Sequence, residues 1–276
     1  GEKFTVRWRS DGFAGNVNLD LSTDGTVWQS LAANEANDGV YDWTPVAGAF
    51  PGGDYLLRVS SVAQPGANDR SDATFNLAST VSVFYVNDAS TLGDEYTTAV
   101  GNDTNDGRSA GKPKASLQAL LNAYDFKPGD LILIDAGTYN SSTNLIVDAQ
   151  DSGVTIRGAV NSASVLNRGN TNSGQYAFLL GTNATDVTLD RVTLTGGQYG
   201  FVVTDNSGAH RFTLSRSDIV GNSTTGIWIG QSVDDGKVIG NLVHDTGNSF
   251  GIYTQYTTRL LVDGNHVYNV SQGIYS

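Results

Sequence analysis

The chain has 276 residues, of which 39% are hydrophobic, so it is long enough for about two domains with buried cores. It contains no Cys, which excludes disulfides and thiol chemistry, and no run of about 18 apolar residues, which excludes a membrane-spanning helix in this stretch. The formal net charge of −12 argues against nucleic acid as a partner, since neutralising phosphate requires clustered Lys and Arg.

The composition also indicates a compartment. The chain holds 33 Gly, no Met, and many Asn, Thr, Ser and Asp residues. This bias is typical of secreted bacterial β-proteins, so we expect an extracellular or cell-surface location. An acidic polysaccharide would be repelled by the net charge unless cations bridged it.

Residues 1–80 consist of short runs separated by turn signals. Residues 17–21 alternate between apolar and polar, Asp24-Gly25 marks a hairpin, and residues 55–59 form another run. About six or seven such strands predict a small β-sandwich. Three tryptophans fit the interior of a sandwich, which we favour, or alternatively a platform on which sugars stack: Trp8, Trp28 and Trp43.

Three strings in this module resemble a known domain: residues 37–45 (Asn-Asp-Gly-Val-Tyr-Asp-Trp-Thr-Pro), residues 53–59 and residues 69–75. They are similar to an Ig-like domain found in the Ser-Thr-rich GPI-anchored surface-protein family and in bacterial exoproteins. The resemblance implies an accessory domain associated with a cell wall or surface. It brings no catalytic residues with it.

A new strand at residues 81–86 predicts a boundary between an N-terminal domain of residues 1–80 and a second domain of residues 81–276. Within the second domain we expect a cap over residues 81–130 and repeating coils over residues 131–276. The last four residues fall in the middle of the repeating pattern, so we expect the coils to continue beyond this stretch.

The cap contains one amphipathic helix. Ser116 is a suitable N-cap, and the residues after it form the i, i+3, i+4, i+7 stripe of a helix with one apolar face: Leu117, Leu120, Leu121 and Tyr124. This face must cover other apolar residues. Lys127-Pro128-Gly129-Asp130 ends the helical segment.

The polar stretch of residues 87–114 is rich in side-chain oxygens, and loops of this kind hold Ca²⁺ in some proteins. Its spacing does not match an EF-hand, because Pro113 stands at the twelfth position counted from Asn102, where a bidentate Glu is needed. We favour a set of Asx turns as the interpretation. The alternative is a Ca²⁺ site with these candidate ligands: Asp94, Asp103 and Asp106.

From residue 131 on the sequence repeats itself about every 25 residues. One line of equivalent positions is Arg191, Arg216, Asn241 and Asn265, and a second is Gly200, Gly226, Gly251 and Gly273. Each period matches one coil of a parallel β-helix, in which coils stack about 4.8 Å apart. About five or six coils fit. Aliphatic residues are predicted to stack inside: Val187, Leu189, Leu194, Leu214, Ile219, Ile227, Ile229 and Ile239.

Two members of the first line are chemically identical, so Asn241 and Asn265 are candidates for a stacked amide ladder. The other two members are Arg191 and Arg216, which cannot stack in a buried column. We therefore expect the whole column to face water.

Several strings of the cap and first coil resemble a known fold: residues 84–86, 105–107, 113–120, 128–130 and 136–139. They are similar to the start of right-handed parallel β-helix proteins of the pectate-lyase-like superfamily, which holds enzymes and non-enzymatic surface proteins. The resemblance implies the fold and says little about activity. The expected fold class is all-β: an Ig-like β-sandwich, then a right-handed parallel β-helix with a short N-terminal capping α-helix.

Lyases and epimerases on this fold abstract a proton from a uronic acid, which requires a base and a cation that neutralises the carboxylate. The last coils hold suitable residues, which resemble those of alginate-acting β-helix proteins in type only. The catalytic candidates are His244, Tyr253, Arg259, His266 and Tyr268, and the binding candidates are Tyr256 and Trp228. The period places His244 beside Tyr268 and Tyr253 beside Tyr275, so one long face would present His, Tyr and Arg together.

Turn and surface residues of a repeat array give the same set by chance, and we favour that interpretation. A glycosidase needs paired carboxylates, and the adjacent Asp234 and Asp235 are expected to be solvated in a turn instead. Two functions remain. The favoured one is a structural or adhesive part of a large extracellular protein that contacts polysaccharide, other surface proteins or copies of itself. The alternative is a carbohydrate-active enzyme, either a polysaccharide lyase or a uronate epimerase.

Overall fold

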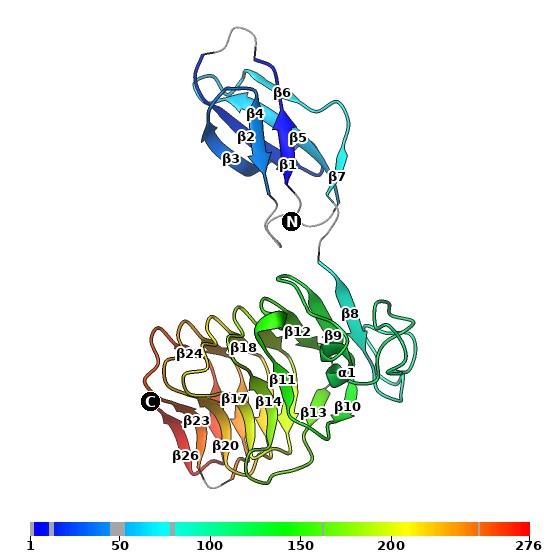
Figure 1. The fold of residues 1–276 in the computed structure, drawn as a ribbon, viewed down its shortest axis with the longest axis vertical. Coiled ribbons are helices and arrows are strands. Elements are labelled where there is room, and N and C mark those ends of the chain that lie inside the picture. The colour runs from blue at the N-terminus through cyan, green and yellow to red at the C-terminus, as the bar shows by residue number, and fades with distance from the viewer. Residues whose placement is uncertain (1–2, 11–13, 45–52, 78–80, 162, 248) are drawn as a thin grey trace. The chain divides into compact units, whose positions relative to one another are not determined.

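The computed structural model of the chain describes residues 3–10, 14–44, 53–77, 81–161, 163–247 and 249–276 (Figure 1). Contacts divide the chain into two compact units, Gly1–Val81 and Ser82–Ser276, which we call the N-terminal unit and the solenoid. Both consist mainly of β-strands, and the described residues include one α-helix of 5 residues. None of the helices in the described part is long and apolar enough to cross a membrane.

The N-terminal unit is built from antiparallel strands. One sheet has the order β3 (Gln29–Glu35), β2 (Val17–Ser22), β5 (Gly53–Ser61), β6 (Asn68–Arg70), and β7 (Phe75–Leu77) also pairs with β5. A second sheet joins β1 (Phe4–Arg7) to β4 (Val40–Trp43). Strand β2 buries Val17, Leu19 and Leu21, because successive side chains of a strand point to opposite faces. The core cluster is Leu21, Trp43, Tyr55 and Leu77.

The solenoid stacks coils that contribute strands to three parallel sheets (Figure 1). The first sheet has the order β8 (Val83–Val86), β9 (Leu131–Ile134), β12 (Thr155–Gly158), β15 (Thr188–Asp190), β18 (Thr213–Ser215), β21 (Lys237–Ile239), β24 (Leu261–Asp263). The second has the order β10 (Gly137–Asn140), β13 (Ser164–Asn167), β16 (Thr193–Thr195), β19 (Asp218–Val220), β22 (Leu242–His244), β25 (His266–Tyr268). The third has the order β11 (Leu145–Val147), β14 (Tyr176–Leu180), β17 (Tyr199–Val203), β20 (Thr225–Ile229), β23 (Phe250–Thr254), β26 (Gln272–Tyr275).

Apolar side chains of successive coils stack inside the solenoid, as the repeats predict. In the first sheet Ile156, Leu189 and Leu214 lie in register and are buried. In the third sheet the rings of Phe178 and Phe201 stack with their centroids 5.8 Å apart. Each strand therefore adds to one continuous core, and no coil buries its apolar face alone.

The prediction for one interior residue was wrong. Ile239 is half-buried and lies in register with Ser215 and Asp263, in a column that points outward. Its neighbour Val238 is fully buried and occupies the interior position in its place. Both residues are aliphatic, so hydrophobicity alone could not decide which of them points inward.

From residue 183 onward each coil holds four corner residues with positive φ, and the coil of the second set holds a fifth, Gly208. The four sets are Asn183, Asp186, Arg191, Gly196; then Asn206, Arg211, Arg216, Gly221; then Ser232, Asp235, Gly240, Asp245; and then Tyr256, Arg259, Gly264, Asn269. Gly, Asn and Asp adopt this left-handed conformation most readily. The Asn, Asp and Gly bias of the sequence is therefore a consequence of these corners.

The amide ladder forms, but its column is buried. Asn241 is 2% exposed, and its Nδ2 donates to the carbonyl oxygen of Leu214 and to Oδ1 of Asn265. Its Oδ1 accepts from the backbone N–H of Ser217. The expectation that this column faces water was wrong.

The error came from a shift of one residue in the alignment. Arg191 and Arg216 occupy the left-handed corner position that Gly240 and Gly264 occupy in the next two coils. The buried column holds the residues that follow them, among them Ser217 and Asn241. The arginines consequently lie at the corner, where their side chains reach the surface.

The helix α1 (Leu117–Leu121) begins where the sequence predicts. Ser116 is the N-cap, and its Oγ accepts from the backbone N–H of Ala119. Three leucines of the helix belong to the same core cluster as Tyr139 and Leu145 of the first coil: Leu117, Leu120 and Leu121. A short 3₁₀ helix, Ala149–Asp151, follows β11.

A buried carboxylate ties the segment before this helix to the first coil. Asp135, which directly follows β9, is fully buried. It accepts hydrogen bonds of 2.7 to 2.9 Å from the backbone N–H groups of Glu95, Tyr96, Thr97 and Ala136, and from the Thr97 hydroxyl. One side chain thus satisfies four backbone donors that a buried loop would otherwise leave without partners.

Candidate functional site

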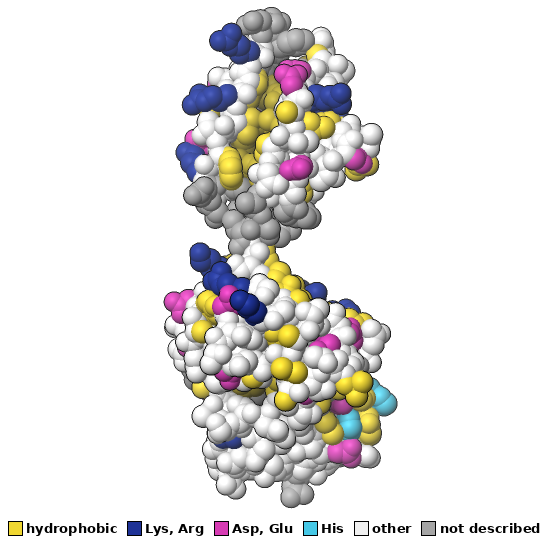
Figure 2. All heavy atoms as spheres, turned by 90° about the vertical axis from the view of Figure 1, so that its right-hand side faces the viewer, with side chains coloured by type: hydrophobic (Ala, Val, Ile, Leu, Met, Phe, Trp, Pro, Cys, Tyr) yellow, Lys and Arg dark blue, Asp and Glu magenta, His cyan; other side chains and the backbone are white. Residues whose placement is uncertain are grey.

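The second sheet places His244 against the next coil in the predicted register. His244 lies opposite Tyr268, and their rings stack with centroids 4.7 Å apart and planes 4° apart. Its Nε2 is 3.0 Å from Oδ1 of Asp218, and its Nδ1 is 2.6 Å from Oδ2 of Asp245. Figure 2 shows histidine side chains beside apolar and acidic ones on the solenoid surface.

The two carboxylates occupy both ring nitrogens of His244. One carboxylate oxygen lies within hydrogen-bonding distance of each ring nitrogen. Burial raises the pKa of Asp218, although the charge of His244 acts to lower it. Hydrogen bonds from His244 and Asn269 lower the pKa of Asp245. With both nitrogens engaged and its side chain 14% exposed, His244 presents no free base to a substrate.

The remaining catalytic candidates lie in three different places. His266 and Tyr268 are neighbours on the second sheet, with ring centroids 5.0 Å apart. Tyr253 belongs to β23 of the third sheet, where it pairs with Tyr275 as the period predicts. Arg259 lies at a corner before the first sheet. The five residues therefore do not share one face, contrary to expectation.

Arg259 is part of a column of alternating charges along one row of corners. Arg211 forms a bidentate ion pair with Asp186, and Arg259 forms one with Asp235 of the coil before it. The hydrogen bonds from Arg259 lower the pKa of Asp235. Asp234, the other half of the suspected carboxylate pair, accepts from the backbone N–H of Thr258. These groups hold successive coils together and are not arranged as an acid and base pair.

The outer face of the third sheet carries a run of aromatic side chains, which we call the aromatic ladder: Tyr176, Tyr199, Trp228, Phe250, Tyr253 and Tyr275. Trp228 lies between the fully buried Ile227 and Ile229 on β20, so alternation directs its indole outward. Trp228 and Tyr253 are partners in the parallel register.

Ring contacts connect the ladder between several successive coils, and strand register connects Trp228 to Tyr253. The ring centroids are 5.7 Å apart between Tyr176 and Tyr199, and 5.3 Å between Tyr199 and Trp228. Tyr253 stacks on Tyr275 at 5.6 Å with planes 13° apart. Of the two predicted binding residues, Trp228 belongs to this ladder. Tyr256 is 81% exposed at a corner, and no ring contact joins it to the ladder.

Sequence reasoning missed most of the ladder, although a signal was present. Trp228, Tyr253 and Tyr275 each stand two residues after a glycine of the repeating line, and Tyr199 and Phe250 each stand one residue before it. Each of these glycines is the second residue of a strand of the third sheet. A Cβ on Gly226 would lie 2.5 Å from Cγ1 of Val243, so only glycine fits there.

The three candidate Ca²⁺ ligands occupy separate turns. Asp94 Oδ2 accepts from Asn87 and Thr97, and Asp103 accepts from the backbone N–H groups of Ala115 and Ser116. Asp106 accepts from the backbone N–H of Arg108, as in an Asx turn. Across the described ranges, no group of three or more His, Cys, Asp or Glu side chains is arranged to hold a metal ion. Ca²⁺ binding stays a prediction that these side chains do not support.

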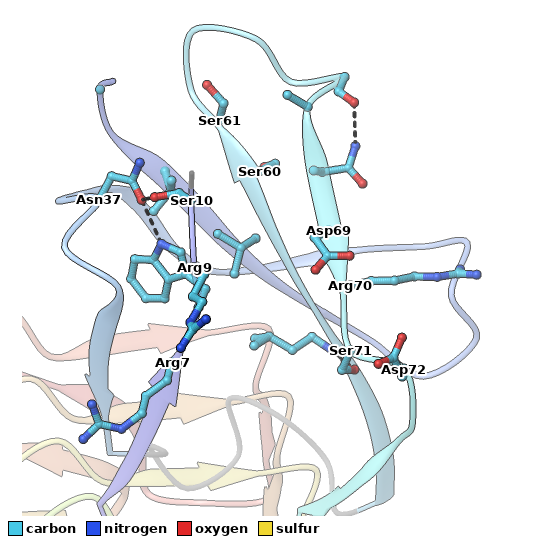
Figure 3. A pocket seen from close by; sticks show the side chains of 18 residues that line it. Arg7, Arg9, Ser10, Asn37, Ser60, Ser61, Asp69, Arg70, Ser71 and Asp72 are labelled. Atoms are coloured by element: carbon cyan, nitrogen blue, oxygen red, sulfur yellow. Dashed lines mark hydrogen bonds between the residues drawn. The ribbon is translucent and has the colours of Figure 1, made fainter. Parts of the chain in front are cut away.

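The N-terminal unit contains a cleft of about 600 Å³ (Figure 3). The segment after β1 forms one wall, and residues of β5 and β6 form the other. Trp8 lines it and donates from Nε1 to Oδ1 of Asn37, which also accepts from Ser10. The other two tryptophans lie elsewhere: Trp43 is in the core, and Trp28 lies under the guanidinium of Arg58. The three tryptophans therefore form no common platform.

The solenoid defines the class of protein: an all-β chain with a right-handed parallel β-solenoid. A family model described as "Right handed beta helix region" matches residues 176–276. Among solved structures, the chain is similar to the pectate lyase Pel9A, with 15% identity over 70% of this chain and a TM-score of 0.48. It is also similar to a rhamnogalacturonan lyase, with 13% identity over 71% of this chain and a TM-score of 0.41.

The match covers 56% of the Pel9A chain and 62% of the rhamnogalacturonan lyase chain. A search of curated protein sequences found no match to this chain.

Proposed function

We propose that this chain is a structural and adhesive part of an extracellular or cell-surface modular protein, and that its solenoid binds polysaccharide along the aromatic ladder. In this proposal residues 1–80 form an Ig-like domain of the kind found in the Ser-Thr-rich GPI-anchored surface-protein family. Residues 81–130 cap the first coil, and residues 131–276 form a rigid rod that carries the ladder.

The observation that carries the proposal is the continuity of the ladder. Successive coils lie about 4.8 Å apart, so a polysaccharide that runs along the stack meets one ring after another. The flat face of an aromatic ring packs against the apolar face of a sugar, and a tyrosine hydroxyl can also form a hydrogen bond. The Nε1 of Trp228 is buried and makes no hydrogen bond, so Trp228 contributes its ring only. Ring contacts run from Tyr176 through Tyr199 to Trp228, and another joins Tyr253 to Tyr275. Strand register places Tyr253 beside Trp228 on the next coil.

Truncating the ladder is expected to abolish most of this binding. We expect Trp228→Ala and Tyr253→Ala each to weaken binding roughly tenfold, because each removes a stacking surface. The measurement is affinity electrophoresis through gels that contain pectin, alginate or a neutral glucan, followed by calorimetry with oligosaccharides of the retained polymer. Trp228→Phe, which keeps a ring, should retain most of the affinity.

The matched control is Tyr256→Ala, which removes an exposed tyrosine that makes no ring contact with the ladder. Its binding should equal that of the unchanged chain. An equal loss of polysaccharide binding in Tyr256→Ala would indicate that the polysaccharide binds at the corner loops and not along the ladder. If none of the polymers retards the unchanged chain, the proposed function is wrong.

The second candidate is a polysaccharide lyase or uronate epimerase, favoured by one observation: His244 lies between two carboxylates and beside Tyr268. Because both ring nitrogens are engaged, we expect no unsaturated uronate to form. Incubation with alginate and pectin, with and without Ca²⁺, and ultraviolet detection of the product tests the lyase. NMR analysis of the products tests the epimerase. A product that disappears in His244→Ala would establish the enzyme instead.

A further inference from the structure

Three arginines converge on one buried carboxylate at the edge of the first sheet, and we call Arg157, Arg191 and Arg216 the arginine cluster. The side chain of Asp190 is 1% exposed. Its Oδ2 lies 2.7 Å from Nη2 of Arg216, 3.1 Å from Nη1 of Arg191 and 3.3 Å from Nε of Arg157. Its Oδ1 accepts from Nε of Arg216 and from the hydroxyl of Ser215.

The cluster has more positive charge than Asp190 can balance. One carboxylate faces three guanidinium groups, so two positive charges remain in excess. No second carboxylate within the described ranges forms an ion pair with these arginines; the nearby Glu95 accepts from the backbone N–H groups of Val160 and Asn161 instead. A carboxylate that only holds two coils together needs one arginine as its ion-pair partner, as Asp186 has in Arg211.

Most donors of the cluster make no hydrogen bond to Asp190, and the three side chains are partly exposed. Each guanidinium carries five N–H groups, of which Arg216 uses two and Arg191 one on this carboxylate. Arg157 makes no hydrogen bond through its buried Nε. The side chains of Arg157, Arg191 and Arg216 are 38%, 28% and 56% exposed. Their heads thus line a surface at which an anion would meet several donors at once.

The backbone under the cluster is strained at two of its members. Arg191 and Arg216 have φ of 55° and 49°, and the equivalent positions in the next two coils are Gly240 and Gly264. Side chains other than Gly, Asn and Asp adopt this region less readily. Arginine also stands at positive φ at Arg211 and Arg259, where each pairs with one aspartate, so the backbone allows arginine at several corners.

We propose that the arginine cluster binds an oxyanion, namely a carboxylate or sulfate group of an acidic polysaccharide. Guanidinium groups pair with such oxyanions through parallel hydrogen bonds, and the local excess of positive charge stands against the overall charge of −12. The site lies on the first sheet and uses none of the residues of the aromatic ladder. It therefore goes beyond the proposed function and stands or falls separately from it.

Calorimetry with the full chain tests the proposal, using inorganic sulfate, trigalacturonate and methyl-esterified trigalacturonate as probes. We expect trigalacturonate or sulfate to bind and the uncharged ester to fail. Arg157→Gln should weaken oxyanion binding roughly tenfold, because one charge-assisted contact is lost. Its melting temperature should fall only slightly, because Asp190 keeps its ion pairs with Arg191 and Arg216 when the contact to Arg157 at 3.3 Å is lost. Asp190→Asn should strengthen binding severalfold, because the competing carboxylate is gone.

The matched control is Arg211→Gln, which removes the same charge from a one-to-one pair elsewhere on the solenoid. If Arg211→Gln and Arg157→Gln weaken oxyanion binding equally, the effect comes from the net charge of the chain and the proposal is wrong. Equal binding of the ester would overturn it as well, as would the failure of both oxyanions to bind. Binding of sulfate without trigalacturonate supports an oxyanion site that selects sulfate. Trp228→Ala should leave oxyanion binding unchanged, which separates this site from the ladder.

Discussion

Replacing Asp135 with Ala is expected to destabilise the solenoid by about 4 kcal/mol or more, because four backbone N–H groups, two in buried and two in part-buried hydrogen bonds, lose their acceptor at once. The loss should also free the segment around Glu95 to Thr97 from the first coil. Chemical denaturation followed by circular dichroism measures the change. Asp106→Ala is the control, since the exposed Asp106 accepts from the single N–H of Arg108, and it should cost less than about 1 kcal/mol.

The same carboxylate predicts a dependence of stability on pH. Burial by itself raises the pKa of Asp135, but hydrogen bonds from the backbone of Glu95, Ala136 and Tyr96 together outweigh burial and hold the pKa below its ordinary value. A lowered pKa in the folded state stabilises above the unfolded value of about 3.9, and this contribution is lost as the pH falls through the folded pKa. Asp135→Ala should lose less stability than the unchanged chain below about pH 4. An identical acid response in both would contradict this assignment.

Gly158→Ala is expected to be the second severe change, with a loss of about 3 kcal/mol or more in the free energy of unfolding. Gly158 ends β12, and a Cβ there would lie 1.9 Å from the carbonyl oxygen of Arg191 in the next coil. The obstacle is backbone, which cannot rotate aside, so the two coils must separate. Thermal unfolding of the purified variant measures the loss.

The control for this collision is Gly273→Ala, which also adds one methyl group to a solenoid glycine. A Cβ on Gly273 meets no atom within 4 Å, so its stability should change by less than about 0.5 kcal/mol. Equal stability of the two variants would mean that the coils tolerate a wider separation than the structure shows.

Much of the solenoid could be predicted from the sequence because stacked coils place equivalent residues at a constant spacing. The period paired His244 with Tyr268 and Tyr253 with Tyr275, and the structure confirms both pairs. The same reasoning failed by one residue at Arg191 and Arg216. The true equivalents of these arginines are Gly240 and Gly264, which share their corner position. Because arginine resembles asparagine more than glycine in polarity, the alignment matched them with Asn241 and Asn265 instead.

The candidate sites were harder to predict from the repeat period than the coils were. The aromatic ladder had a periodic signal, whereas the arginine cluster had one only for Arg191 and Arg216, which are 25 residues apart. Arg157 and Asp190 lie in register across a coil that is longer than the others, so a constant period does not pair them. The convergence of three guanidinium groups on Asp190 also depends on the corner conformation of two of them.

The sequence by itself determined that this chain stacks parallel coils around an apolar interior, because the repeat of apolar runs and turn residues is a direct consequence of the geometry of one coil. Only the tertiary structure decided which side chains share a face. The residue types at a corner do not specify how far the chain rotates there. As a result His244, Tyr253 and Arg259 lie in three different places. Arg157, Arg191 and Arg216, by contrast, lie around one carboxylate.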